Sequence, residues 1–274
     1  MKHSMFIIKL MVLLVPSLFF LSCTINDSDP FNDTKKEVNS QNQKTNNTNS
    51  TKLYFSGYSW DVESGNGKNP GNNNWSKNNA WVDAKGKLHL RITKNKGKWY
   101  CAQVSTTEYF RFGKYEWFVE GRIDKLDKNV VLGLFNYPDP NVGKDGTNEI
   151  DIEFAKWGKT KNDIGNYTVY PAIDGLKKWT YPFSVKLQGN YTTHRFTWSS
   201  KKVIFQSLHG WTSDDKNQIK KKTYTPSKYK SYIPQNSERI FINLWLYKDE
   251  NEDNPRPPND GKEVEIIISK FSVY

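Results

Sequence analysis

The sequence predicts an all-β domain built from two packed antiparallel sheets, a sandwich or jelly roll. Two observations carry this prediction: apolar and polar residues alternate in many short runs, and Gly, Asn, Asp or Pro separate the runs. The chain also holds 10 Trp, 15 Tyr and 15 Phe, residue types that favour strands. We find no convincing helical stripe longer than a few turns and no repeat of fixed length. So many strands require a second sheet to cover the apolar face of the first.

Residues 1–23 are expected to form an export signal outside the fold. Lys2 and Lys9 accompany the apolar run IIKLMVLLVPSLFF, and the sequence LSC follows it. Cys23 stands where a bacterial lipoprotein signal places its acylated residue, which makes Cys23 the predicted lipidation site and the membrane lipid its anchor. A plain secretory signal and a single anchor helix are the alternatives. Lys9 argues against the helix, because it shortens the apolar span below the roughly 20 residues that a bilayer requires.

Residues 24–52 predict a flexible tether, and residues 53–274 the folded domain. The first of these segments is rich in Asn, Thr, Ser, Asp and Lys and has almost no apolar residues to bury. We therefore expect a protein of the cell envelope or cell surface. The formal net charge is +11, but the basic residues are spread along the chain. This spread is typical of a solvated surface, and we do not expect a nucleic acid partner. The protein is expected to be a monomer.

Short alternating runs recur from Leu53 to the end of the chain, and the clearest of them begin at residue 88. Each is an alternating run bounded by turn residues. The runs cover residues 88–93, 114–121, 130–137, 149–154, 165–171, 194–199, 202–210, 239–247 and 263–274.

The cysteines and histidines do not predict a metal centre. Cys101 lies in the alternating run WYCAQVST and is expected to be a buried, small apolar side chain. The four His are scattered, and there is no CxxC motif, so a zinc site is not expected. No cofactor is expected to be required.

The stretch TNEIDIEF, residues 147–154, places three carboxylates on one face of a strand. Glu149, Asp151 and Glu153 alternate with apolar residues, and residues i, i+2 and i+4 of a strand share a face. Three like charges in a row repel one another, so an ordinary solvent face would include relieving residues. Crowding is useful where one carboxylic acid must stay protonated near neutral pH while another is ionised.

Glycoside hydrolysis with retention of configuration needs such a division of roles. One carboxylate attacks the anomeric carbon and a second carboxyl group protonates the departing oxygen. Retention requires the two groups to lie roughly 5–5.5 Å apart, whereas residues i and i+4 of a flat strand are about 13 Å apart at the backbone. A strongly curved strand could bring them together. From spacing alone, an ordinary acidic strand face remains the commoner interpretation.

Four segments in order resemble family 16 glycoside hydrolases, the group of bacterial lichenases and laminarinases. EIDIEF with its preceding Gly-Thr-Asn resembles the active-site strand of that family. The pattern Phe-x-x-Gly-x-Tyr-Glu at residues 110–116, the segment THRFTWSSKKVIFQSLHG and the segment RIFINLWLY are similar to other strands. The likeness runs from about Trp60 to Tyr274. No Trp precedes Glu149, and residues 206–210 replace the Tyr-x-x-Asp-Gly turn of many relatives.

The resemblance implies a concanavalin-like jelly roll with a concave glycan-binding face. By motif position Glu149 would be the nucleophile, Asp151 its hydrogen-bonded assistant and Glu153 the general acid/base. The motif lacks an extra residue before its last Glu, as in the lichenase type. The implied activity is hydrolysis of a β-glucan-type polysaccharide, endo-β-glucanase-like, through a covalent glycosyl-enzyme intermediate. The alternative is a non-catalytic carbohydrate-binding or adhesion lipoprotein on the same fold.

The resemblance also implies residues that contact the polysaccharide. Asn243 and Trp245 match family positions in the cleft, Asn166 lies near another, and His194 matches a residue close to the catalytic strand. Tyr137 ends a predicted strand and is a further candidate. A core position for Trp245 and a structural role for His194 are the alternatives. Some relatives carry structural calcium, and the sequence identifies no ligands for it. The loops that would select the substrate cannot be matched to relatives.

Overall fold

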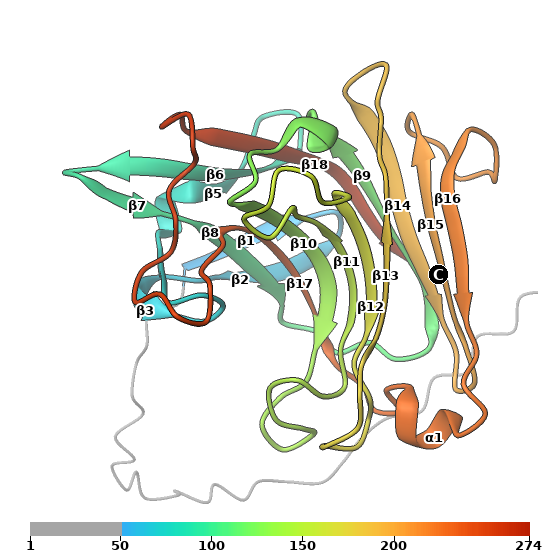
Figure 1. The fold of residues 1–274 in the computed structure, drawn as a ribbon. Helices are drawn as coiled ribbons and strands as arrows, with labels where there is room; N and C mark the ends of the chain where they lie inside the picture. The colour runs from blue at the N-terminus through green and yellow to red at the C-terminus, as the bar shows by residue number, and fades with distance from the viewer. Residues whose placement is uncertain (1–50) are drawn as a thin grey trace, which may run out of the picture. The chain divides into compact units, whose positions relative to one another are not determined.

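The computed structural model describes residues 51–274, and two large antiparallel sheets account for most of them (Figure 1). The predicted signal segment, Cys23 and residues 24–50 lie outside the described residues. Thr51 and Lys52, which we expected at the end of the tether, form the start of the first strand instead and pair with Val62 and Asp61. The folded domain therefore begins two residues before the predicted boundary at residue 53.

The first large sheet has eight strands and carries the acidic stretch. In spatial order they are β1 (Thr51–Phe55), β2 (Tyr58–Val62), β8 (Ala102–Thr106), β17 (Arg239–Leu246), β10 (Val130–Tyr137), β11 (Ile150–Phe154), β12 (Gly165–Val169) and β13 (Trp179–Phe183). In Figure 1 the strands β10 to β13 run side by side in green to yellow, and β10 bends along its length.

The second large sheet covers the apolar face of the first. Its order is β16 (Gln218–Tyr224), β15 (Val203–His209), β14 (Tyr191–Trp198), β9 (Gly113–Glu120), β18 (Val264–Val273), β6 (Leu88–Asn95) and β5 (Ala80–Val82), and β7 (Lys98–Tyr100) pairs with β6. A small third sheet joins β3 (Gly65–Lys68) to β4 (Asn73–Trp75). The helical segments are short: η1 (Lys77–Asn79), η2 (Ile123–Lys125) and α1 (Tyr229–Tyr232).

This architecture confirms the predicted jelly roll of two antiparallel sheets. Every predicted run overlaps a strand of the structure, and the ends of run and strand differ by at most a few residues. The strands that the sequence did not single out include β3, β4, β5 and β7, which have only three or four residues each. Runs of that length hold too few alternations to show a period of two.

Aromatic side chains fill the space between the sheets. Trp117 of β9 packs against Phe196 and Phe271, with ring centroids 5.5 and 5.3 Å away. Tyr167 of β12 crosses the interior, and its hydroxyl donates a hydrogen bond to Ser207 Oγ of β15 at 2.8 Å. Burial of such side chains is the main favourable term in the folding of the domain.

Cys101 is fully buried, as predicted, and its thiol donates to Asn73 Oδ1. Burial raises the pKa of the thiol to about 12, which keeps the group protonated and unreactive. Among the helices of the described residues, none has the length and apolarity to cross a membrane.

Gly165 provides a test of how tightly the edge of the first sheet is packed. A Cβ atom there would lie 2.5 Å from the ring of Phe183, its partner on β13. We expect Gly165→Ala to lower the free energy of unfolding by about 1–3 kcal/mol, measured by urea denaturation. Gly189→Ala is the matched control, because no atom lies within 4 Å of a Cβ at that position. Equal stability of the two variants would contradict the packing argument.

Candidate active site

The acidic face and the apolar face of β11 separate as the alternation predicts. Ile150, Ile152 and Phe154 are fully buried against the second sheet. Asp151 is 3% exposed, and Glu149 and Glu153 are half-buried on the opposite face. Glu149 lies one residue before β11, and its carbonyl oxygen accepts a hydrogen bond from the N–H of Tyr170 at 2.8 Å.

Strand register surrounds Glu153 with small and uncharged side chains. Glu153 faces Gly133 on β10 and Asn166 on β12, and Gly133 in turn faces Asn243 on β17. Gly133 has no Cβ, so the side chain of Asn243 extends over it: a Cβ there would lie 2.4 Å from Asn243 Oδ1. The row through Glu153 therefore contains two hydrogen-bonding amides, and one of them fills the space above Gly133.

The row through Asp151 has a different composition. Asp151 faces Phe135 on β10 and Thr168 on β12, and Phe135 stacks on Phe241 of β17 with ring centroids 5.3 Å apart. Threonine hydroxyls and aromatic rings are the groups that hydrogen-bond and stack on sugars.

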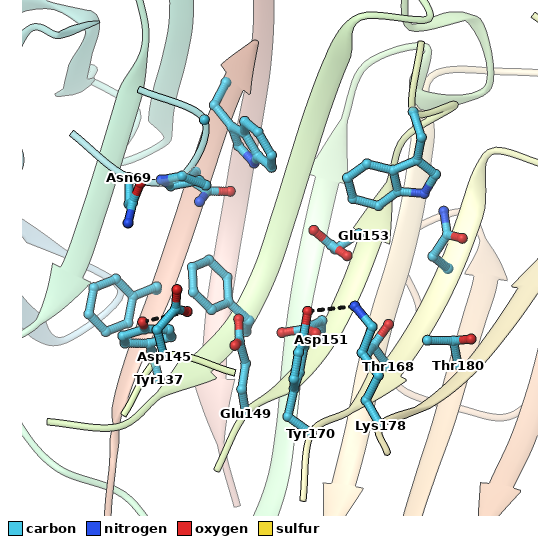
Figure 2. A pocket seen from close by; sticks show the side chains of 18 of the residues that line it. Asn69, Tyr137, Asp145, Glu149, Asp151, Glu153, Thr168, Tyr170, Lys178 and Thr180 are labelled. Carbon is cyan, nitrogen blue, oxygen red and sulfur yellow. Dashed lines mark hydrogen bonds between the residues drawn. The ribbon is translucent and has the colours of Figure 1, made fainter. Parts of the chain in front are cut away.

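Both rows open into one cavity of about 670 Å³, a size that suits a bound ligand. Figure 2 shows Glu149, Asp151 and Glu153 projecting into it. Its lining residues are Asn69, Pro70, Gly71, Gln103, Phe135, Tyr137, Asp145, Glu149, Asp151, Glu153, Trp157, Asn166, Thr168, Tyr170, Lys178, Thr180, Pro182, Phe241, Asn243 and Trp245.

Asp151 and Glu149 shift each other's pKa in opposite directions. Burial raises the pKa of Asp151 well above its usual range, and the charges of Glu149 and Glu153 raise it further. Asp151 is therefore the member of this pair that holds its proton near neutral pH. Burial raises the pKa of Glu149 to about 8, while the hydrogen bond with Asp151 acts to lower it.

Glu153 is poised to titrate near neutral pH. Burial raises its pKa to about 7, and the positive charge of Lys178 opposes the rise. Lys178 is the one basic side chain that lines the cavity within residues 51–274. Its ammonium donates a hydrogen bond to the Tyr170 hydroxyl at 2.8 Å, and Figure 2 shows the pair beside the carboxyl groups.

Four predicted substrate contacts line this cavity: Tyr137, Asn166, Asn243 and Trp245. The Tyr137 hydroxyl donates to Asp145 at 3.0 Å, and the amide of Asn243 donates to Gln103 at 3.2 Å. The side-chain amide of Asn166 donates hydrogen bonds to the carbonyl oxygens of Ala155 and Ile164. These bonds fix the two ends of the loop after β11. Trp245 is 8% exposed and lies 6.4 Å from the ring of Trp157.

The structure places His194 away from the cavity, which corrects the expected substrate contact. His194 belongs to β14 of the second sheet and is fully buried. Its two ring nitrogens hydrogen-bond with Ser207 Oγ and Thr192 Oγ1, and the ring packs 4.6 Å from Phe154. Burial lowers its pKa to about 3, so the ring is a neutral support on the core side of β11. Inward-facing positions of β14 meet only the apolar side of β11.

Several cavity residues were not identified from the sequence. Phe241 and Thr168 each lie two residues from a predicted contact and share its face, so alternation contained the signal. Lys178, Trp157 and Asn69 come from loops. Loop positions have no period from which a face could be assigned.

Within residues 51–274, no group of three or more His, Cys, Asp or Glu side chains is arranged to hold a metal ion.

A comparison with models of known protein families shows which family the chain belongs to. The sequence model for "Glycosyl hydrolases family 16" matches residues 67–260, a span that contains the whole acidic row. The chain belongs to glycosyl hydrolases family 16. It is therefore a glycosidase, and the predicted resemblance is confirmed.

Solved structures share the family fold at low sequence identity. A Bacillus licheniformis β-glucanase has a TM-score of 0.59 and 22% identity, covering 81% of this chain and 94% of that one. A Bacteroides ovatus family 16 enzyme in complex with a G4G4G3G product has a TM-score of 0.60 and 15% identity, covering 78% and 94%. A Mycobacterium marinum β-1,3-glucanase gives 0.55 and 17%, covering 78% and 90%. No curated protein sequence matches the chain significantly.

The raised pKa of Glu153 predicts a pH-dependent cost to stability. In the folded domain Glu153 keeps its proton up to about pH 7, against 4.5 for an ordinary Glu. Between these values the unfolded chain ionises first, so stability falls as pH rises. We expect Glu153→Gln to raise Tm at pH 8 by about 2–4 °C, the shift that about 1 kcal/mol produces in a domain of this size, and less at pH 5. The exposed Glu250→Gln is the control. An equal change at both pH values would contradict the burial argument.

The charge of Lys178 acts on all three carboxyl groups in the same direction. It lowers the pKa of each of them. We therefore expect Lys178→Met to move both limbs of the kcat/KM-pH profile to higher pH. Lys177→Met is the matched control, because this exposed neighbour does not line the cavity. A Lys178→Met profile that superimposes on the wild type would exclude Lys178 from the electrostatics of the site.

Proposed function

We propose that this family member is a retaining endo-β-glucanase or a close relative. The observation that carries the proposal is the shared cavity: two carboxyl groups with different surroundings line it from one strand, and a third stands between them. Retention by double displacement uses one ionised and one protonated carboxyl group. The roles of Glu149 as nucleophile and Glu153 as acid follow their positions in the family motif. Lys178 lowers the pKa of both groups, and the hydrogen bond with Asp151 lowers that of Glu149 alone.

In the first step the Glu149 carboxylate attacks the anomeric carbon. The bond from that carbon to the leaving sugar oxygen breaks, and Glu153 transfers its proton to this oxygen. The product is a glycosyl ester of Glu149. In the second step the Glu153 carboxylate takes a proton from water, the water oxygen attacks the anomeric carbon, and the Glu149 carboxylate is released. Two inversions give net retention.

Asp151 would control the charge of the nucleophile during this cycle. While Glu149 is ionised, the Asp151 O–H donates to it and keeps it oriented. Once the ester forms, the hydrogen bond to the ester weakens, and it strengthens again as the carboxylate departs. A neutral Asp151 also limits the repulsion inside the row.

The composition of the cleft supports a neutral β-glucan-type substrate. Phe135, Phe241, Trp157 and Trp245 offer ring surfaces, and most polar lining groups are amides and hydroxyls. The Bacillus licheniformis neighbour is a β-glucanase, and the Bacteroides ovatus enzyme holds a G4G4G3G product. We propose the same class of polysaccharide for this chain, with β-1,3-1,4-glucan as the first to test.

We further propose that the enzyme is exported and anchored through lipid on Cys23. The support is the sequence of residues 1–23, and residues 24–50 provide the spacer between anchor and domain.

Substitution of the two outer carboxyl groups tests the assignment. We expect Glu149→Gln to lower turnover of β-1,3-1,4-glucan by about 10³-fold or more, because no glycosyl ester can form. Glu153→Gln should lose about 10²–10⁴-fold. Asp145→Asn, which changes a cavity carboxyl group outside the row, should lose much less. Wild-type turnover by either row variant, measured as reducing-sugar release, would refute the mechanism.

Azide distinguishes the two roles. In Glu149→Ala, azide can occupy the space of the nucleophile and attack the anomeric carbon once, giving the inverted glycosyl azide. In Glu153→Ala, azide attacks the glycosyl ester and gives the retained product. NMR of the product anomer measures this outcome, and exchanged stereochemistry would reverse the two assignments.

A further inference from the structure

Two buried polar side chains lie at the start of the catalytic strand and take no part in the proposed reaction. Asn136, near the end of β10, and Glu238, just before β17, are both fully buried. Neither lines the cavity. A buried carboxyl group without an ion-pair partner is costly to a fold, so its presence calls for a physical reason.

The side chain of Asn136 links this carboxyl group to the backbone that flanks Glu149. Its Oδ1 accepts a hydrogen bond from the N–H of Ile150 at 2.9 Å. Its Nδ2 lies 3.4 Å from the carbonyl oxygen of Asn148 and donates to Glu238 Oε2. Both atoms of one amide are therefore engaged, and they bracket the residue between Asn148 and Ile150.

The chain on either side of Glu149 is held by further contacts. Asn148 adopts a left-handed φ of 54°, and its side chain donates to the carbonyl of Ala172 at 3.3 Å. On the other face, the carbonyl of Glu149 accepts from the N–H of Tyr170. Asn136 accepts the hydrogen bond from the N–H of Ile150, the residue after Glu149. Removal of the Asn136 side chain therefore takes away this restraint on the Glu149–Ile150 peptide.

Glu238 is itself fixed and neutral. Its backbone exchanges two hydrogen bonds of 2.8 Å with Phe110. Burial raises the pKa of its carboxyl group to about 9; the hydrogen bond from Asn136 opposes this rise and the charge of Glu149 adds to it. At pH 7 Glu238 thus accepts from Asn136 without placing a second negative charge behind Glu149.

We propose that Asn136 and Glu238 form a positioning pair that sets where the Glu149 carboxylate stands in the cleft. The pair acts through the Glu149–Ile150 peptide and touches no sugar. This inference rests on the proposed role of Glu149 as the nucleophile. A shift of the nucleophile by a fraction of an ångström slows its attack, while the subsites that bind the glucan chain stay in place.

The experiment compares Asn136→Ala, Glu238→Leu and Glu238→Gln with the wild type. Asn129→Ala is the matched control: Asn129 is a buried Asn just before β10, and its amide donates to the carbonyl of Pro257. Three quantities are measured for each folded variant: Tm, kcat and KM on β-1,3-1,4-glucan, and the rate of covalent labelling by a 2-deoxy-2-fluoro β-glucan oligosaccharide with a dinitrophenolate leaving group. Peptide mapping of the labelled wild type identifies the nucleophile.

We expect Asn136→Ala to lower kcat and the labelling rate together by about 10–100-fold, with KM within about threefold of the wild type. Glu238→Leu should do the same where it folds. Glu238→Gln should recover most of the rate, because its amide oxygen still accepts from Asn136. Asn129→Ala should lower Tm and leave kcat and labelling unchanged.

Three results would overturn the inference, and each has a different consequence for the proposed mechanism. A label on a residue other than Glu149 in the wild type removes the nucleophile assignment, and the positioning pair with it. A label on Glu149 that forms at the wild-type rate in folded Asn136→Ala removes the positioning pair and leaves the mechanism intact. A loss confined to KM, or to Tm alone, likewise assigns Asn136 a binding or purely structural role.

Discussion

The site depends on one physical constraint: three carboxyl groups must share one face of a strand without driving the strand apart. Repulsion between neighbouring carboxylates would destabilise β11 if all three were ionised. The opposite face offsets this, because Ile150, Ile152 and Phe154 are fully buried and each such burial contributes about 1.5–3 kcal/mol. Desolvation then keeps protons on the row and reduces its charge. The same burial that secures the strand thereby creates an acid that is protonated near neutral pH.

Neighbouring strands complete the site by contributing almost no charge. The positions beside Asp151 and Glu153 hold Thr168, Asn166, Gly133 and Phe135. A Lys or Arg at any of them would form an ion pair with the nearest carboxylate, depress its pKa and disturb the proposed division into acid and nucleophile. The positive charge comes from Lys178 in a loop, where it acts on the whole row rather than on one member. The uncharged rows and the acidic row are thus one electrostatic arrangement.

The sequence predicted the layers of the fold and the acidic row because both depend on a period of two. Alternation fixes which side of β11 faces the core, whatever the neighbouring strands are. It cannot fix which strands are neighbours, so the pairing of Glu153 with Gly133 and Asn166 became visible only in the sheet. His194 shows the limit most clearly. It packs directly on Phe154, close to the catalytic strand as the resemblance implied, yet on the core side of it. Proximity along a motif does not distinguish the two faces of a sheet, and Lys178 and Trp157 lie in loops with no period at all.

Gly133 shows how a residue without a side chain can shape a cleft. Its φ is not in the left-handed region, so no turn requires glycine at this position. The requirement comes from Asn243, whose Oδ1 would lie 2.4 Å from a Cβ there. That oxygen is buried and has no hydrogen-bond partner among residues 51–274, and the adjacent position in the row is Glu153. A buried acceptor is stable only when a donor reaches it. Under the proposed function a sugar hydroxyl bound beside Glu153 would supply that donor, so the amide that fills the space above Gly133 is placed to meet substrate. The glycine and the amide therefore act as one unit, because the missing side chain makes room for the amide beside the acid.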